Sequence, residues 1–403
     1  MMSKMTKYEK FLESGDNKYK DFLVISPLMR GGIIPTEVRL KAQDWMDVGY
    51  INCYTCIDGR SSFLNNPPVK EFLQSVAEFF GGDSAEHTFG CRAAQFSVMK
   101  AVSGLVKSGE FANMIVADSL SHYSTNIAAE MNSLEVTEVP HTGYPEYLID
   151  PEHYDEKIEE VKEKTGKLPA LVMATHADPY QGNIAPVKEI GEICSRHEVP
   201  YMINAAYSAG VQPIDMREMK ADFLTVSAHK SMASIAPLGF LVTNFVWKKE
   251  VFAMSQDRPD WSGRVFGKKI PNIFGCSIGG LPLISSMLSF PYVKERVLRW
   301  DEEKDKINSF IREMEDIGDI MLLGQRPHEH HLLSFETPVL DEIAETHRKK
   351  GFFLAEELKK CRIVGIHKGK TKNIKLSVYG MTDDERGKIL ETFFDIIKKG
   401  KPS

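Results

Sequence analysis

The sequence predicts an α/β protein in which a large, mostly parallel β-sheet is covered by helices on both faces. Between residues 110 and 245, short runs rich in β-branched and apolar residues alternate with turns or amphipathic stretches. This alternation is typical of strands joined by crossover helices. Beyond residue 295 the sequence changes to long charged helices, as expected of a smaller α+β domain. The length of 403 residues favours about two or three domains.

Six apolar runs are the expected strands of the large sheet. They span residues 111–118, 134–139, 168–175, 199–206, 221–228 and 238–244. One connecting helix is clear, because Pro186 opens it and apolar residues recur at helical spacing from Val187 to Cys194. Pro200 then starts the next strand. Cys194 is therefore expected to lie in the core.

We expect two domains: a large one over residues 1–295, including an N-terminal arm, and a small C-terminal one over residues 296–403. The small domain begins with charged helices, followed by short strands and two more helices. Residues 257–272 have the composition of a long surface loop. Loops of this length are often functional.

The composition is that of an ordinary globular protein, with 42% hydrophobic and 26% charged residues. The net charge of -6 gives no global positive field, so a polyanionic partner must be met by local patches. The polar N-terminus does not resemble a signal peptide, and no run approaches the ~18 apolar residues of a membrane span. We expect a cytoplasmic protein without membrane contact, whose six cysteines stay reduced.

The main functional signal is Lys230, in a Ser-Ala-His-Lys sequence that follows the apolar run ending at Val226. The carboxyl end of a strand is where an open α/β sheet presents ligand-binding groups. A lysine held there out of water has its pKa lowered from about 10.4 toward the ~7–8 that suits Schiff-base chemistry. A lone lysine at a strand end is usually only solvated, so this signal needs partners.

Such partners lie upstream of Lys230. Asn204 ends a strand and can reach a pyridine nitrogen, and the two alanines after it leave room for a flat ring. His122 follows another strand and offers an aromatic plane for stacking. The turn from His87 to Ala94 enters a helix whose first N–H groups can hold a phosphate. Singly, these residues would be a turn former, a surface histidine and a helix cap. Together with Lys230 they predict a site for pyridoxal 5'-phosphate (PLP).

Cys53 and Cys56 form a C-x-x-C pair. This spacing lets two thiolates share a metal, a cluster or a persulfide. From the residues alone, a functional pair and a chance occurrence are equally open. Cys361 ends an amphipathic helix, which favours a structural role.

With these residues, the chain resembles the archaeal Sep-tRNA:Cys-tRNA synthases, PLP enzymes of fold type I that convert O-phosphoserine on tRNA into cysteine. The likeness covers nearly the whole chain. Its most specific parts are an Arg-Gly-Gly segment followed by the C-x-x-C pair, and the sequence FETPVLDEIA; it also includes YINCYTCIDGR, HYSTNIAAE, LVMATHADPYQGN, INAAYSAG and SAHKSMASIAP. The likeness to the broader cysteine desulfurase group is clear but thinner.

The resemblance implies an aspartate aminotransferase-like fold and a PLP-dependent β-replacement that turns O-phosphoseryl-tRNA(Cys) into cysteinyl-tRNA(Cys). It implies that Lys230 carries the cofactor and removes the α-proton, that His122 stacks on the ring and that Asn204 meets the ring nitrogen. It places Gly90, Cys91, Arg92, Ser227 and His229 around the cofactor phosphate, and His176 and Asp178 near the ring oxygen or substrate.

The resemblance also adds Cys276 to Cys53 and Cys56, and implicates these three cysteines in sulfur relay and in binding an iron-sulfur cluster. The partners it implies are a second copy of the chain, tRNA(Cys), a phosphoseryl-tRNA synthetase and a sulfur donor. A homodimer would complete each site across its interface.

Two segments depart from the family pattern. Where the family reads Gly-Ala-Arg-Glu-Gly-Lys, residues 90–95 read Gly-Cys-Arg-Ala-Ala-Gln, so Cys91 replaces a small residue. Where the family has an arginine after Cys-Thr-Ser, this chain has Gly279. That arginine would suit the substrate phosphate, since a charge-assisted contact is commonly worth ~1.5–3 kcal/mol. The candidates to replace it are cations of the long loop: Arg258, Arg264 and Lys268.

The small domain carries three further signals. Lys375 stands where the desulfurase segment has a carboxylate-binding arginine, as expected if the substrate carboxylate is esterified to tRNA. Basic runs such as His347 to Lys350 and Lys398 to Lys401 can neutralise RNA phosphates or can be solvated surface. The histidine run from His328 to His331 hints at metal, but it precedes a strand-like segment.

Two alternative functions stay open at this stage. One is a desulfurase or lyase that acts on a free amino acid. The other is a non-catalytic PLP fold that serves in a sulfur-relay complex, which the retained Lys230, His122 and Asn204 disfavour.

Overall fold

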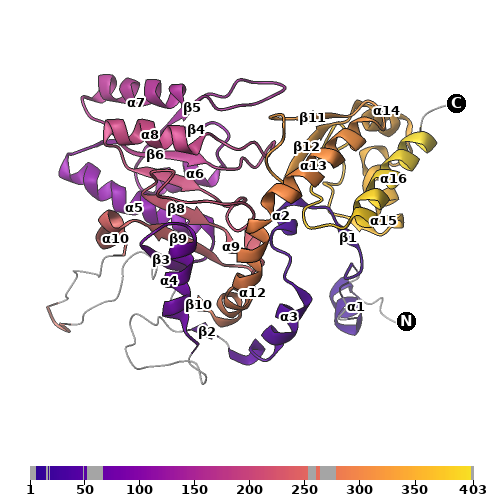
Figure 1. Cartoon of the computed structure of the whole chain (residues 1–403), viewed down its shortest axis with the longest axis horizontal. Coiled ribbons are helices and arrows are strands. Elements are labelled where there is room, and N and C mark those ends of the chain that lie inside the picture. The colour runs from indigo at the N-terminus through magenta and orange to yellow at the C-terminus, as the bar shows by residue number, and fades with distance from the viewer. Residues whose placement is uncertain are drawn as a thin grey trace.

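The computed structural model describes residues 6–14, 17, 19–48, 50–51, 67–252, 260–263 and 278–400. Within these residues a seven-stranded sheet forms the body of a large domain, and a three-stranded sheet forms that of a smaller C-terminal domain (Figure 1). No helix in the described part of the chain is long and apolar enough to cross a membrane.

The large sheet has the strand order β3-β9-β8-β7-β6-β4-β5. Its central pairs are parallel, and β9 runs antiparallel to both of its neighbours. The strands are β3 (Ser84–Thr88), β4 (Ala112–Asp118), β5 (Glu135–Val139), β6 (Pro169–Thr175), β7 (Tyr201–Asn204), β8 (Phe223–Val226) and β9 (Gly239–Thr243). Each of the six predicted runs contains one of these strands, so the predicted α/β class and parallel sheet are confirmed.

Helices cover both faces of this sheet because successive strand residues point to opposite sides. Val116, Val172 and Ile203 belong to one core, which α4 (Val69–Phe79), α7 (Glu152–Thr165), α8 (Val187–His197) and α12 (Gly280–Leu298) cover. Their neighbours Ile115, Leu171 and Met202 belong to the opposite core, under α5 (Cys91–Ser108), α6 (Ser124–Met131) and α10 (Phe245–Val251).

The predicted helix after Pro186 is confirmed as α8, and Cys194 is buried in its core-facing side. The predicted surface loop at 257–272 lies outside the described residues except for 260–263. The domain boundary at residues 295/296 stays a prediction; α12 runs through it.

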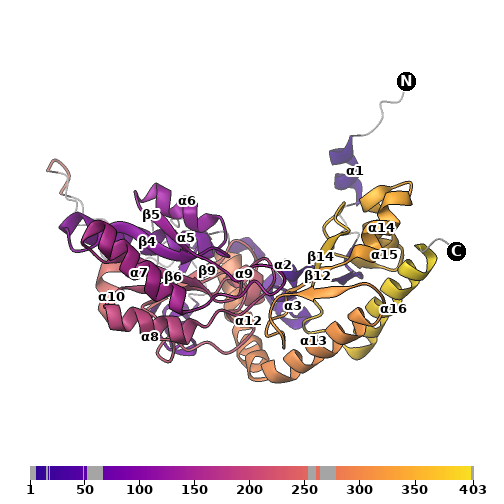
Figure 2. The same ribbon diagram turned by 90° about the horizontal axis from the view of Figure 1, so that it is seen from above.

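The smaller domain consists of β11 (Met321–Leu323), β12 (Leu333–Glu336) and β14 (Asn373–Leu376) with helices packed on them. The helices are α13 (Trp300–Glu315), α14 (Pro338–Thr346), α15 (Phe353–Lys360) and α16 (Asp383–Gly400), with a short turn η2 (Lys350–Phe352). Figure 2 shows α12 and α13 leading from the large domain to this one.

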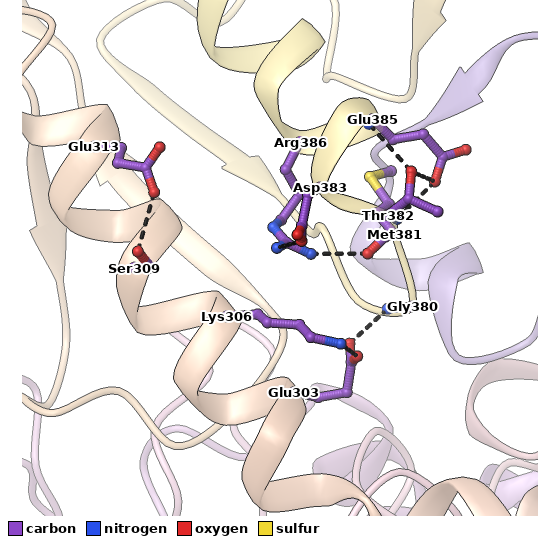
Figure 3. A network of polar contacts seen from close by, with 10 residues as sticks. All are labelled: Glu303, Lys306, Ser309, Glu313, Gly380, Met381, Thr382, Asp383, Glu385 and Arg386. Carbon is purple, nitrogen blue, oxygen red and sulfur yellow. Dashed lines mark hydrogen bonds and ion pairs between the residues drawn. The ribbon is translucent and has the colours of Figure 1, made fainter.

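A network of polar contacts fixes the start of α16 (Figure 3). The backbone N–H of Thr382 donates to Glu385 Oε2 at 2.9 Å, and the N–H of Glu385 donates to Thr382 Oγ1 at 3.2 Å. This reciprocal pair is a capping box, which satisfies N–H groups that the helix itself cannot. Glu303 of α13 accepts from the N–H of Gly380 at 2.9 Å. The network therefore joins two helices of the small domain.

The N-terminal segment reaches both domains. It includes α1 (Lys7–Ser14), β1 (Leu23–Val24), α2 (Pro27–Arg30), α3 (Thr36–Gln43), η1 (Met46–Val48) and β2 (Tyr50–Ile51). β1 pairs with β13 (Ile363–Val364) of the small domain, and β2 pairs with β10 (Ile278–Gly279). Arg296 of α12 is buried and donates to the carbonyl oxygens of Gly31 at 3.0 Å and Gly210 at 2.7 Å.

Candidate active site

A cavity of about 310 Å³ opens where the parallel strands of the large sheet end. Thr175 of β6 pairs with Asn204 of β7, and Asn204 pairs with Thr225 of β8, so these strand ends lie level with one another. Lys230 follows β8 in the short helix α9 (Ala228–Ser231). The cavity is lined by residues from each of these ends, among them His122, Thr175, Asn204, Ser227 and Lys230.

The amine of Lys230 is the candidate nucleophile of the cavity, which it lines. Burial lowers its pKa, and the nearby Arg92 guanidinium lowers it further, against an opposing contribution from Cys91. Nζ lies 4.5 Å from the centre of the Tyr207 ring, so an aromatic face holds it in place. A lowered pKa raises the fraction of neutral amine, which is the form that attacks a carbonyl.

Asn204 lies on the floor of the cavity. Its Oδ1 accepts a hydrogen bond from the N–H of Ala206 at 3.1 Å and lies 3.1 Å from the sulfur of Cys91. Asn204 is 4% exposed, so its amide is a fixed polar group that can face the nitrogen of a flat ring.

His122 forms one wall. The N–H of Ser124 donates to its Nδ1 at 3.3 Å, and the Ser124 hydroxyl lies 2.8 Å from the same atom. That hydroxyl is also 3.2 Å from Oε1 of the buried Gln95. Burial lowers the pKa of His122. The ring is therefore held in one orientation in its neutral form, which suits stacking.

The N-terminus of α5 forms an anion cradle at the other end of the cavity. Gly90 precedes this helix with φ of +100° and ψ of 173°, a conformation that is essentially open only to glycine. A helix start presents free N–H groups and the positive end of the helix dipole. Ser227 and His229 flank the cradle, with the Ser227 hydroxyl 3.3 Å from His229 Nε2, while His229 Nδ1 lies 2.7 Å from the Leu238 carbonyl.

Arg92 lies at the exposed rim rather than in the cradle. Its guanidinium donates to the hydroxyl of Tyr123 at 2.6 Å and stacks over the same ring at 5.1 Å. The arginine lines the mouth of the cavity. Its position suits a charged group that enters from outside.

The two predicted substrate residues on the loop after β6 are both buried. His176 has its Nδ1 2.9 Å from the Ser208 hydroxyl, and burial lowers its pKa to about 4. The carboxylate of Asp178 accepts from the N–H groups of Tyr180, Gln181 and Asn183, each at 2.7 Å. Both side chains order the loop that carries the cavity residues Ala177 and Pro179. Their contact with substrate stays a prediction.

Several predicted residues lie outside the described part of the chain: Cys53, Cys56, Cys276, Arg258, Arg264 and Lys268. Among the described residues, no group of three or more histidine, cysteine or acidic side chains could hold a metal ion. This includes the run from His328 to His331, whose histidines are buried. Lys375 donates to the carbonyl of Pro179 at 2.9 Å, beside the cavity.

The structure adds side chains that the sequence did not single out. Tyr207 faces the Lys230 amine, and Gln95 and Ser124 orient His122. Thr225 contacts Cys91 below the cavity floor. Tyr207 stands three residues after Asn204, and this spacing was the available signal for it. Gln95 had been noted only as a departure from a charged family residue.

The cavity fits PLP in each of its parts. A pyridine ring would lie between His122 and the Ala206 backbone, a phosphate would meet the N-terminus of α5, and an aldehyde would meet Lys230. Lys230, His122, Asn204, Gly90, Ser227 and His229 all line this one cavity. Their contacts with the cofactor stay a prediction.

Comparisons with known proteins agree with this geometry. The family model described as O-phosphoseryl-tRNA(Sec) selenium transferase, SepSecS, matches residues 69–398. O-phospho-L-seryl-tRNA:Cys-tRNA synthase 2 of Archaeoglobus fulgidus is 46% identical over 381 residues, covering 94% of this chain and 95% of the relative. The O-phospho-L-seryl-tRNA:Cys-tRNA synthase of Methanothermobacter thermautotrophicus is 41% identical, covering 95% of this chain and 97% of the relative.

Solved structures give the same picture. A chain from the crystal structure of a SepCysS-SepCysE N-terminal domain complex matches with a TM-score of 0.86 and 37% identity, covering 98% of this chain and all of that one. The apo cysteine desulfurase of Thermococcus onnurineus matches with a TM-score of 0.74 at 17% identity, covering 94% and 95%. The second likeness concerns the fold alone.

Proposed function

The chain belongs to the O-phospho-L-seryl-tRNA:Cys-tRNA synthase family, and from this we propose that it is a PLP-dependent transferase that makes cysteinyl-tRNA(Cys) from O-phosphoseryl-tRNA(Cys). The observation that carries the proposal is the Lys230 amine. Its pKa is lowered by burial, and it shares one cavity with Asn204, His122 and the N-terminus of α5.

Bound PLP would supply the electron sink that lets a proton leave the substrate Cα and phosphate leave Cβ. Lys230 Nζ is the attachment point and, in its neutral form, the base that takes the Cα proton and later returns it. His122 holds the ring plane, and the N–H groups after Gly90 hold the cofactor phosphate. The buried floor around Asn204 excludes water from the reacting face.

We propose that Arg92 meets the phosphate of the substrate. It stands at the mouth of the cavity, where Tyr123 fixes its guanidinium. An arginine pairs with a phosphate through two N–H groups at once, whereas a lysine acts only as a point charge. This favours Arg92 as the phosphate-binding residue. Arg258 and Arg264 of the long loop are proposed as further phosphate contacts.

The sulfur step is proposed to use Cys53, Cys56 and Cys276, as carriers of sulfur or as ligands of an iron-sulfur cluster. Support for this role comes from the family resemblance, which includes the C-x-x-C pair and Cys276.

Four other parts of the proposal are carried over from the family resemblance. They are a homodimer, a phosphoseryl-tRNA synthetase partner, a separate sulfur donor and a cytoplasmic location. Each is a proposal for this chain.

The test offers PLP-loaded protein O-phosphoseryl-tRNA(Cys) with a sulfide source, and separately free cysteine. We expect cysteinyl-tRNA from the first mixture and no sulfide release from the second. Lys230→Ala should abolish product and should remove the covalent PLP adduct found by borohydride reduction and mass spectrometry. Sulfide release from free cysteine, with no cysteinyl-tRNA formed, would identify a desulfurase instead.

The cysteines are tested in the same assay. Cys53→Ala and Cys276→Ala should keep the PLP absorption spectrum and lower sulfur incorporation, whereas Cys361→Ala, which changes an exposed thiol of the small domain, should do neither. Unchanged cysteinyl-tRNA formation in both of the first variants would remove these cysteines from the reaction.

A further inference from the structure

A buried thiol lies directly beneath the amide of Asn204. Cys91 is the first residue of α5 and is 8% exposed. Its sulfur lies 3.1 Å from Asn204 Oδ1 and 3.3 Å from the hydroxyl oxygen of Thr225.

The orientation of the Asn204 amide follows from its other neighbour. The backbone N–H of Ala206 lies 3.1 Å from the amide atom assigned as Oδ1. A backbone N–H can only donate, so this atom must be the oxygen. The ambiguity between the two ends of an asparagine amide is thereby removed.

The thiol has a proton to give. Burial raises the pKa of Cys91 to about 11, so the sulfur is protonated at neutral pH. The Thr225 hydroxyl lies 3.3 Å from the sulfur and 3.5 Å from the Ile203 carbonyl, so it has the choice of donating to either. When the hydroxyl donates to the sulfur, the S–H points to Asn204 Oδ1, 3.1 Å away.

Two donors therefore occupy the two lone pairs of Asn204 Oδ1. Within the described part of the chain, the amide nitrogen makes no hydrogen bond, and Asn204 lines the cavity. The amide thus offers N–H groups, not an acceptor, to a ligand above it.

We propose that Cys91 is a positioning residue whose thiol holds the Asn204 amide so that it donates a hydrogen bond to the pyridine nitrogen of PLP, which stays unprotonated. The inference rests on the proposed function and deepens it. An unprotonated ring withdraws electrons less strongly than one paired with an aspartate. Phosphate is a good enough leaving group for this to suffice.

The test uses full-length protein loaded with PLP labelled with ¹⁵N at the pyridine nitrogen. Solid-state NMR distinguishes a protonated from an unprotonated ring nitrogen directly. We expect the unprotonated signal in the wild-type protein and in Cys91→Ser, whose hydroxyl still donates. Cys91→Ala frees one side of the amide, so its signal should broaden or split, and the Kd for PLP should rise by about three- to tenfold.

A second variant replaces the hydrogen-bond donor at the ring nitrogen with an acceptor. Asn204→Asp places an acceptor at the ring nitrogen, so its signal should move to the protonated position. A protonated signal in the wild-type protein would overturn the proposal. So would an unprotonated signal in Asn204→Asp, or a Cys91→Ala variant that matches the wild type in both signal and Kd.

These outcomes separate the two proposals. An unprotonated ring in a protein that makes no cysteinyl-tRNA would leave the role of Cys91 standing and refute the proposed function. A wild-type protein that binds no PLP would refute both.

Discussion

Gly90 shapes the anion cradle more directly than any other residue beside it. Its φ of +100° is one that side-chain-bearing residues rarely adopt, and a Cβ there would stand 3.1 Å from Cε1 of His229. We expect Gly90→Ala to tilt the first turn of α5 and to displace His229. The Kd for PLP, measured by fluorescence titration, should rise at least tenfold, which corresponds to about 1.4 kcal/mol or more.

Gly104, on the same helix, gives the matched control. A Cβ at Gly104 would meet no heavy atom within 4 Å. Gly104→Ala should leave the Kd for PLP unchanged and should stabilise the helix by up to about 1 kcal/mol. Equal PLP affinity in both variants would show that the conformation of Gly90 does not matter for the cradle.

Arg92 offers a second test at this scale. Its charge is fixed at the rim by the Tyr123 hydroxyl. Replacing Arg92 with Gln should raise the KM for O-phosphoseryl-tRNA by about tenfold or more, since hydrogen bonds to charged groups contribute about 1.5–3 kcal/mol. The Kd for PLP should change little.

Tyr123→Phe keeps the ring under the guanidinium but removes its hydrogen bond. This variant should raise the same KM by a smaller factor, about fivefold or less. If Arg92→Gln leaves KM unaltered, the substrate phosphate is bound elsewhere, and the loop residues Arg258 and Arg264 become the candidates.

Sequence reasoning found the residues whose chemistry is rare and missed those that only orient them. Asn204 ends β7, while His122 and Lys230 follow the ends of β4 and β8, and a parallel sheet brings such ends together. Tyr207 and Thr225 were missed because an aromatic or hydroxyl residue near a strand end is ordinary, and the spacing of Tyr207 after Asn204 is a weak signal on its own. Arg92 could be placed near the phosphate loop from sequence, but the side to which its guanidinium turns depends on Tyr123, which lies on another element, at the start of α6.

At the scale of elements, the start of α16 is a clear case of local stabilisation. Thr382 and Glu385 satisfy each other's N–H groups, and the helix then buries Ile389, Phe393 and Ile397 in the small-domain core. Thr382→Ala should lower the free energy of unfolding by about 1 kcal/mol. Chemical unfolding followed by circular dichroism measures this.

The control for this variant is Ser309→Ala on α13, drawn in the same network (Figure 3). Ser309 contacts Glu313 at 3.0 Å in the middle of a helix, where no orphan N–H depends on it. We expect a change within about 0.5 kcal/mol. A loss from Thr382→Ala no larger than that from Ser309→Ala would contradict the capping role.

The elements that the sequence predicted were those with a long enough pattern. The strands were predicted from six apolar runs rich in β-branched residues, and α8 from its helical spacing. By contrast, β1 and β13 are two residues each, so they carry no periodicity, and only their pairing in the folded chain defines them. The loop at 257–272 was predicted from composition, and that prediction stands untested over most of its length.

At the scale of the whole molecule, buried histidines lie where the two domains meet. His330 of the small domain donates from Nε2 to the Tyr207 carbonyl of the large domain at 3.2 Å. His331 stacks on Tyr379 with ring centres 5.1 Å apart and has Nδ1 3.0 Å from the Ser377 hydroxyl. Each of these histidines is 1% exposed or less. His330 therefore bonds across the domain boundary, and His331 lies beside it with ring centres 4.3 Å apart.

These groups make stability depend on pH. Burial lowers the pKa of His176 and His328 to about 4, and burial with the Arg296 and Arg30 guanidiniums lowers that of His331 to about 3. In the unfolded chain each histidine titrates near 6.5. The unfolded chain thus binds more protons below about pH 6.5, so stability is full above that pH and falls as the pH decreases toward 3–4.

Replacing one of these groups tests the argument. His331→Phe keeps a ring on Tyr379 but cannot take a proton, so its stability should fall less between pH 7 and pH 4, by on the order of 3 kcal/mol. At pH 7.5 it should be less stable by about 1 kcal/mol, because the Ser377 hydroxyl loses a partner. Unfolding by urea across this pH range measures both effects.

His367→Phe, which changes an exposed histidine of the same domain, should leave the pH dependence unaltered. Parallel curves for His331→Phe and the wild type would mean that this histidine does not couple folding to protons. The acid sensitivity would then have to come from His176, His328 and His330.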